Sequence, residues 1–169
     1  LAVSSTAVEQ LARVDYLIVD KTGTLTAGRP QVTQLDGPPE ALAIAAALER
    51  RSSHPLAAAF RPHEDPASVA DDVVEVPGVG LTGRIVAGPG AGRRFRLAGA
   101  AGTRVDDPDL VLSADDVPWA SFRVADPLRP EVPAAIAALR GLGVEVEIAS
   151  GDRPAVVGAV AATLGIRRW

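Results

Sequence analysis

Apolar residues recur with two different spacings along this chain, one typical of strands and one typical of helices. A short apolar run at residues 17–19 predicts a strand that is buried on both faces. Residues 144–149 predict a second strand, which lies between alanine-rich helices predicted at residues 133–142 and 154–164. Residues 6–12 also have a helical spacing. These elements predict a βαβ layer with parallel strands.

The middle of the chain differs in composition and apolar spacing, and it is rich in proline and glycine. One strong helix is predicted at residues 39–51. Alternating apolar and polar positions at residues 73–76 and 81–86 predict strands that pair antiparallel. Residues 88–92 and 106–109 are expected to form flexible loops.

The βαβ pattern at the two ends of the chain and the antiparallel pattern in its middle predict a mixed α/β fold with two domains. Residues 1–26 and 122–169 are expected to form a partial Rossmann-like domain, and residues 27–121 an inserted α+β domain with an antiparallel sheet. The chain stops at Trp169, before the next parallel strand of the βαβ pattern, so we expect the first domain to be incomplete. A chain that starts at Leu1 and contains no Met is likewise expected to be a fragment.

Composition argues against several classes of function. The 169 residues are 47% hydrophobic but only 4% aromatic, which predicts a core of Ala, Val and Leu. A net charge of −4 argues against a nucleic-acid surface, and the densest basic spot, Arg93, Arg94 and Arg96, is expected to face solvent. There is no Cys for a disulfide or a thiolate metal site. The longest apolar stretch, residues 41–48, is far below the roughly 20 residues that cross a bilayer.

The segment DKTGTLT at residues 20–26 directly follows the first predicted strand. Ligands of open α/β sheets bind beyond the carboxyl ends of the strands, so Asp20 is placed to act as a nucleophile toward phosphorus. Asp20 and Thr22 could also hold a Mg²⁺ ion shared with the incoming phosphate, while the backbone and hydroxyl groups of residues 22–24 offer donors to its oxygens. An inactive Asp/Thr/Gly turn is the alternative.

Lys21 is the only lysine among the 17 basic residues of the chain. A compact ammonium beside the candidate nucleophile suits a cluster of phosphate oxygens better than the planar guanidinium used elsewhere in this sequence. We therefore include Lys21 among the candidate catalytic residues.

The segment DKTGTLT resembles the phosphorylation motif of the P-type ATPases, ion pumps built on the haloacid dehalogenase scaffold. The resemblance implies that ATP phosphorylates Asp20 during a transport cycle. Related phosphatases have a second acid two positions after the nucleophile, where this chain has Thr22. Without that acid, water attack on an aspartyl phosphate lacks its usual proton shuttle, so the phosphoenzyme should persist.

Details of the inserted region are similar to the heavy-metal class of these pumps. That class has a Glu, four residues, and then His-Pro, which matches Glu49 and His54-Pro55 here. The resemblance implies that Glu49 and His54 line the adenine pocket. Chemically, a carboxylate can accept from the exocyclic amine of a purine, and an imidazole can stack on it or hydrogen-bond to it. An ordinary surface histidine at a helix end is the alternative.

Three glycines of the inserted region are further candidates. Gly78 and Gly80 resemble the Gly-x-Gly turn through which the heavy-metal pumps bring backbone close to the nucleotide phosphates; a plain hairpin turn is the alternative. The three-glycine dinucleotide fingerprint that Gly83 would complete requires a following helix, but a strand is predicted there. Gly99 and Ala100 stand where the family has Gly-Asn, and the missing amide predicts a lower nucleotide affinity.

Residues 126–130, with the sequence DPLRP, resemble the segment that re-enters the phosphorylation domain. Ser150, Gly151 and Asp152 resemble the family's Thr-Gly-Asp motif, and the Ser150 hydroxyl could donate to the phosphoryl group on Asp20. Asp152 could also be the N-cap of the helix that follows. The family's downstream Lys and Gly-Asp-Gly motif, whose Asp completes the Mg²⁺ site, are absent from this chain.

The resemblance implies the ATP-binding and aspartyl-phosphorylation part of a heavy-metal-transporting P-type ATPase. ATP and Mg²⁺ are the expected ligands, and the actuator domain and membrane helices of the pump the expected partners, with no nucleic acid and no transported ion bound by this fragment. We expect a soluble cytoplasmic domain of a bacterial plasma-membrane protein that binds nucleotide without turnover. The alternatives are a haloacid dehalogenase-type phosphatase with a cap domain and a nucleotide-binding regulatory module.

Overall fold

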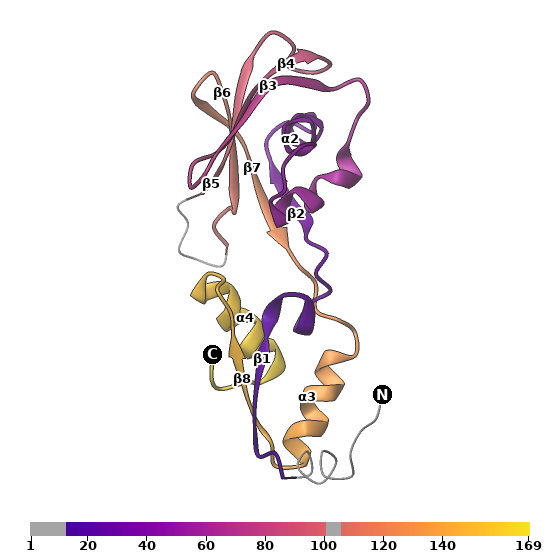
Figure 1. The fold of residues 1–169 in the computed structure, drawn as a ribbon, viewed down its shortest axis with the longest axis vertical. Coiled ribbons are helices and arrows are strands. Elements are labelled where there is room, and N and C mark those ends of the chain that lie inside the picture. Colours follow the sequence, from indigo (N-terminus) through magenta and orange to yellow (C-terminus); the bar gives the residue numbers. More distant parts are fainter. Residues whose placement is uncertain (1–12, 101–105) are drawn as a thin grey trace. The chain divides into compact units, whose positions relative to one another are not determined.

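A computed structural model describes residues 13–100 and 106–169 (Figure 1). The helix expected at residues 6–12 lies outside these residues. The chain divides into two compact units, one formed by Arg29–Pro127 and the other by the described residues before Arg29 together with Leu128–Trp169. Each unit has its own hydrophobic core.

The discontinuous unit is built on two parallel strands. Strand β1 (Tyr16–Asp20) pairs with β8 (Glu145–Ala149) in a register that places Asp20 beside Ala149. Helices α3 (Val132–Gly141) and α4 (Pro154–Leu164) supply apolar side chains to its core. The buried members of this core are Leu25, Val132, Ile136, Val146, Ile148, Val157, Ala161, Leu164 and Ile166.

The expectation that the first strand is buried on both faces is wrong for Ile18. Val19 packs against the core of this unit, but Ile18 is 58% exposed. Successive side chains of a strand point to opposite faces, so the face of β1 that contains Ile18 points away from that core. An isolated parallel bridge also joins Glu147 of β8 to Arg168, near the end of the chain.

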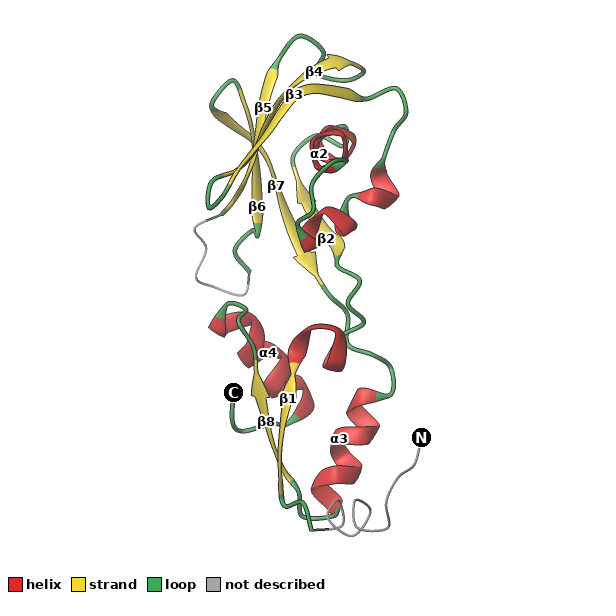
Figure 2. Ribbon diagram, viewed as in Figure 1, coloured by secondary structure: helices red, strands yellow, loops and turns green. Residues whose placement is uncertain are grey.

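The continuous unit is a six-stranded antiparallel sheet covered on one face by helices (Figure 2). The strand order is β2-β7-β6-β5-β4-β3. The most deeply buried helix, α2 (Ala41–Glu49), and the short helices η2 (Pro55–Ala59) and η3 (Arg61–His63) follow β2 in the chain. The strands are β2 (Gln31–Asp36), β3 (Val69–Val76), β4 (Gly80–Ala87), β5 (Arg94–Gly99), β6 (Leu110–Ala114) and β7 (Val117–Ala125).

Aromatic side chains join the helices of this unit to its sheet. Phe60, Phe95 and Phe122 are fully buried, and the rings of Phe60 and Phe122 meet edge to face with centroids 5.2 Å apart. Edge-to-face contact adds to the stabilisation that burial of these rings provides. The three phenylalanines thus fix helical segments against β5 and β7, and Ala, Leu and Ile side chains fill the rest of this core.

The boundary between the units lies later in the chain than the sequence analysis placed it. Strand β7 runs to Ala125 and pairs with both β2 and β6, so residues 122–127 belong with the antiparallel sheet. The mixed α/β fold with an antiparallel sheet is as predicted. None of the helices in the described part of the chain is long and apolar enough to cross a membrane.

Candidate functional site

Asp20 lies at the carboxyl end of β1 and is exposed to solvent. The turn after it is held closed by Thr26, whose hydroxyl accepts a hydrogen bond from the Gly23 N–H at 3.2 Å and donates to the Lys21 carbonyl at 3.1 Å. Gly23 has a φ of +77°, which a residue with a Cβ adopts only at a cost. Thr22 and Thr24 are exposed. The Asp20 carboxylate is therefore exposed to solvent beside a turn that these hydrogen bonds hold closed.

Lys21 is not a free surface cation. Its side chain is only 6% exposed, and its Nζ lies 2.8 Å from Asp152 Oδ2. This ion pair joins the loop after β1 to the loop after β8, at the edge of the sheet where both strands end. Partial burial alone would raise the pKa of the Asp152 carboxyl, but hydrogen bonds from Lys21 and from the Arg153 backbone outweigh it, so that pKa lies below its ordinary value.

The loop of Ser150, Gly151 and Asp152 has internal order. The Asp152 N–H donates to Ser150 Oγ at 3.2 Å, and the Arg153 N–H donates to Asp152 Oδ1 at 2.8 Å. Because the Ser150 oxygen accepts here, its own proton stays available for a ligand. The alternative role of Asp152 as an N-cap is wrong, since α4 begins after Arg153 and has no side-chain cap.

Arg129 is a member of this site whose role the sequence analysis did not assign. Its guanidinium donates to the Gly23 carbonyl at 2.9 Å, and its backbone N–H donates to the Leu25 carbonyl at 3.0 Å. The turn after Asp20 is thus fixed by hydrogen bonds from the segment that re-enters the unit. Arg129 is part of the DPLRP motif that the sequence analysis identified, but only the folded chain shows which loop this arginine contacts.

The second group of candidates lies in the continuous unit. Glu49 ends α2, is 7% exposed, and its Oε2 has no hydrogen-bond partner among the described residues. Burial raises the pKa of the Glu49 carboxyl, and the Glu75 charge adds to this, whereas a hydrogen bond from Ser52 and the charge of His54 oppose it. A buried carboxylate oxygen without a donor is costly, so a ligand donor would stabilise it.

His54 is exposed and lies at the N-cap of η2. Its Nδ1 accepts from the Leu56 N–H at 3.2 Å. An imidazole that accepts at Nδ1 carries its proton on Nε2, so Nε2 is available as a donor or its ring face for stacking. This capping role is also sufficient to explain a histidine here without any ligand.

The three candidate glycines differ in what their positions require. Gly78 has a φ of +77° after Pro77, and the Val79 N–H donates to the Val76 carbonyl, as expected for a type II turn between β3 and β4. A Cβ on Gly80 would lie 2.2 Å from the Leu97 carbonyl oxygen, so β5 alone demands glycine there. A Cβ on Gly99, at the end of β5, would meet nothing within 4 Å. The hairpin therefore accounts for Gly78 and Gly80 without a ligand.

The candidate residues fall into two sets, one in each unit. Asp20, Lys21 and the loop of residues 150–152 meet at one sheet edge, and Glu49 and His54 meet at the end of α2. The fingerprint that would include Gly83 is excluded, because Gly80–Ala87 is strand β4.

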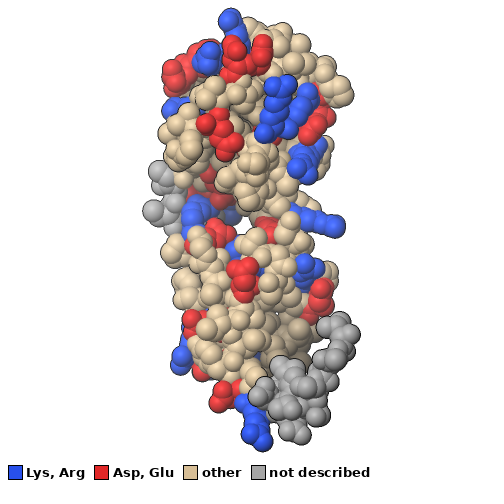
Figure 3. Space-filling model, in the orientation of Figure 1, with Lys and Arg blue, Asp and Glu red and all other residues tan. Residues whose placement is uncertain are grey.

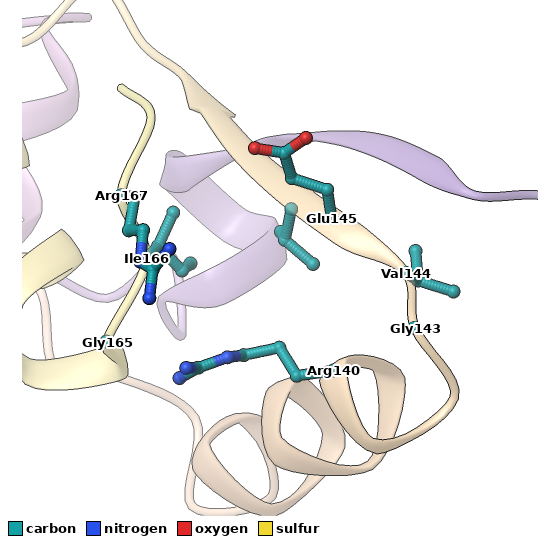
Figure 4. A pocket seen from close by; sticks show the side chains of 8 residues that line it. Arg140, Gly143, Val144, Glu145, Gly165, Ile166 and Arg167 are labelled. Carbon is teal, nitrogen blue, oxygen red and sulfur yellow. The ribbon is translucent and has the colours of Figure 1, made fainter.

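A cavity of about 280 Å³ lies elsewhere in the discontinuous unit (Figure 4). It lies at the amino end of β8, near Arg140 of α3 and Arg167, whereas Asp20 lies at the carboxyl end of the paired strand. Acidic and basic side chains are interspersed over the face drawn in Figure 3, so charge alone does not mark a site on that face. Neither this cavity nor the distribution of charge on that face therefore identifies the candidate residues described above.

Residues 14–169 match the model of the haloacid dehalogenase-like hydrolases. The chain belongs to this family. Its Asp20 ends β1, and open α/β sheets generally bind ligands beyond the carboxyl ends of their strands.

Several proteins of known name are similar to this chain over nearly all of it. Nitrogen fixation protein FixI of Rhizobium meliloti (strain 1021) is 39% identical over 166 residues, covering 96% of this chain and 22% of that protein. The probable copper-transporting ATPase SynA of Synechococcus sp. is 35% identical over 177 residues, covering 94% of this chain and 22% of that protein. The chain thus spans about a fifth of the length of these curated relatives.

A solved structure leads to the same class of protein. The catalytic domain of the CPx-ATPase CopB-B, studied for its conformational changes upon nucleotide binding, superposes with a TM-score of 0.74 at 31% identity. The match covers 98% of this chain and 64% of that one. The predicted resemblance to heavy-metal P-type ATPases is confirmed, since other relatives are also named as copper or zinc transporters.

The haloacid dehalogenase fold implies a Mg²⁺ ion beside the nucleophile, and this chain fits such an ion only in part. No group of three or more His, Cys, Asp and Glu side chains within residues 13–100 and 106–169 could hold a metal ion. Mg²⁺ is often bound by one or two carboxylates together with substrate phosphates, and the exposed Asp20 supplies one such carboxylate, with Thr22 next to it. Asp152 is committed to Lys21.

Proposed function

We propose that this chain is the ATP-binding and aspartyl-phosphorylation part of a heavy-metal-transporting P-type ATPase, in the cytoplasm at a bacterial plasma membrane. Its two discontinuous segments would form the phosphorylation domain and its antiparallel sheet the nucleotide-binding domain. The actuator domain, the membrane helices and the transported ion would belong to the rest of the pump. The observation that supports this most is the exposed Asp20 on a turn fixed to the loop of residues 150–152.

In the proposed reaction an Asp20 carboxylate oxygen attacks the γ-phosphorus of ATP. A bond forms between that oxygen and phosphorus, and the bond to the β,γ-bridging oxygen breaks, so ADP leaves. Lys21 and the Ser150 hydroxyl would stabilise the charge that develops on the phosphoryl oxygens. The Gly23 N–H would not join them, because Thr26 already accepts from it.

Mg²⁺, held by Asp20 and Thr22 together with the phosphates, would neutralise phosphate charge when bound. In the second unit Glu49 Oε2 would accept from the adenine amine. His54 would contact the purine through its ring or Nε2, with the backbone at Gly78, Gly80 and Gly99 near the nucleotide.

The phosphatase alternative requires an acid where this chain has the exposed Thr22. In its absence, an aspartyl phosphate should persist rather than hydrolyse. Hydrolysis of phosphate esters by the purified chain would favour the alternative.

The experiment that tests nucleotide binding is a calorimetric titration of the chain with a non-hydrolysable ATP analogue. We expect binding by the unsubstituted protein and binding weaker by about tenfold for His54→Ala, because one stacking or hydrogen-bonding contact is worth roughly 1–1.5 kcal/mol. His63→Ala is the matched control, since His63 is the only other histidine and belongs to η3. Undetectable binding by the unsubstituted protein at millimolar analogue would contradict the proposal.

A further inference from the structure

Ser52 lies at the centre of the contacts that surround Glu49. It follows α2, and its backbone N–H donates to the Glu49 carbonyl at 2.9 Å. Its Oγ accepts from the His54 N–H at 3.1 Å and lies 3.5 Å from Glu75 Oε2, on strand β3. The Ser52 side chain also lowers the pKa of the Glu49 carboxyl through hydrogen bonding, which opposes the effect of burial. One small side chain therefore connects the helix end, the histidine and the neighbouring strand.

The contacts around Ser52 offer fewer hydrogen-bond donors than the nearby carboxylates can accept. A serine hydroxyl has a single proton to donate, but two carboxylates, Glu49 and Glu75, lie within its reach. Glu75 is exposed and can be solvated by water. Glu49 is buried, and its Oε2 has no partner among the described residues. The shortage of donors therefore falls on Glu49.

We propose that Ser52 and Glu75 are positioning residues of the nucleotide pocket, an inference that rests on the proposed function. Ser52 orients Glu49 and His54, and Glu75 competes with Glu49 for the hydroxyl proton. The donor that Glu49 lacks is supplied by the exocyclic amine of the bound base. Neither residue needs to touch the nucleotide.

The first test is a calorimetric titration with ATP at neutral pH. Ser52→Ala should weaken binding about fivefold, the value of one hydrogen bond that orients the site. Ser52→Thr keeps the hydroxyl and should bind like the unsubstituted protein. Ser53→Ala is the matched control, because Ser53 is the exposed neighbour. Equal affinity for Ser52→Ala and the unsubstituted protein would overturn the proposal.

The second test is the pH at which ATP affinity falls on acidification, where protonation of Glu49 removes its negative charge and weakens it as an acceptor. The charged or polar groups that act on Glu49 are Ser52, His54 and Glu75. Glu75→Gln removes a charge that raises the pKa of Glu49, so the fall should move to lower pH. Ser52→Ala removes a hydrogen bond that lowers it, so the fall should move to higher pH.

Controls separate Glu49 from other groups that titrate. Glu49→Gln gives a reference profile from which the titration of Glu49 is absent. Asp72→Asn removes a different negative charge from the same strand and should leave the midpoint in place. A purely structural role would change affinity without moving the midpoint in opposite directions, and midpoints that stay fixed or shift together would overturn the proposal. If the unsubstituted protein does not bind ATP, the proposed function itself fails.

Discussion

Asp20→Asn should abolish phosphorylation in the full-length pump that we propose contains this chain. Loss of the nucleophile leaves no oxygen of comparable reactivity at the end of β1, so incorporation of phosphate from γ-labelled ATP should fall at least about a thousandfold. The measurement is acid-stable label on the protein that hydroxylamine removes, as expected for an acyl phosphate. Asp20 is exposed, so the substitution should leave folding and nucleotide binding unchanged.

Asp15→Asn is the control for this experiment, because Asp15 is also exposed and directly precedes β1. It should label like the unsubstituted pump. Label that persists at full level in Asp20→Asn would exclude Asp20 as the acceptor. Loss of ATP binding together with loss of label would show instead that the substitution had disturbed the fold.

Elements with strong local signals could be predicted from the sequence. Helix α4 occupies the predicted residues 154–164, because Pro154 suits its first turn and Gly165 ends it in a left-handed conformation with a φ of +65°. Strand β8 is one residue shorter than predicted, and the predicted helix at residues 39–51 is shorter at both ends. The spacing of apolar residues, and the Pro and Gly residues at the ends of elements, are local properties of the sequence. This explains why these elements could be predicted.

The strands that the sequence analysis missed depend on partners far away in the chain. Strand β5 has the alternation of a strand, with Phe95 and Leu97 buried between outward arginines, but those arginines were interpreted only as a basic spot. Strand β7 contains Pro118 and crosses the predicted boundary at residues 121–122. Its place is fixed by pairing with β2 and β6, which no local pattern reveals.

The candidate site could be predicted in its chemistry but not in its contacts. The turn after Asp20 and the loop of residues 150–152 were both identified from motifs. That Lys21 is buried against Asp152, and that Arg129 fixes the Gly23 carbonyl, follows only from the folded chain. Long-range contacts of this kind convert separate motifs into one site.

The sole lysine of the chain has a structural role as well as the proposed chemical one. A buried ammonium is stabilised only if it is paired, and Asp152 provides the partner at 2.8 Å. The Lys21 ammonium would therefore be in position before a phosphoryl group binds, without a rearrangement of the side chain. Such preorganisation is how fixed charge contributes most to catalysis.

A double-mutant cycle measures that pairing and should show the largest stability effect. Asp152→Ala leaves the Lys21 ammonium buried without a partner; because the Asp152 side chain is 39% exposed and water screens the pair, we expect a loss of about 2 kcal/mol rather than the full cost of a buried pair. Lys21→Met should cost less, because Asp152 can be solvated. The double substitution should cost clearly less than the sum, with a coupling of about 1 kcal/mol.

The measurement is urea unfolding followed by Trp169 fluorescence in a Trp119→Phe background, so that only the discontinuous unit is observed. The control is Glu145→Gln, which breaks the exposed pair with Arg168, 2.9 Å long, and should change little. The pH dependence has a definite sign. Because the pKa of Asp152 is lowered in the folded chain, its stabilisation is complete above the ordinary pKa and disappears as pH falls through the lowered one. The difference between the unsubstituted protein and Asp152→Ala should therefore shrink in acid, and a difference that grew in acid, or single effects that simply added, would show that the two side chains are not energetically paired.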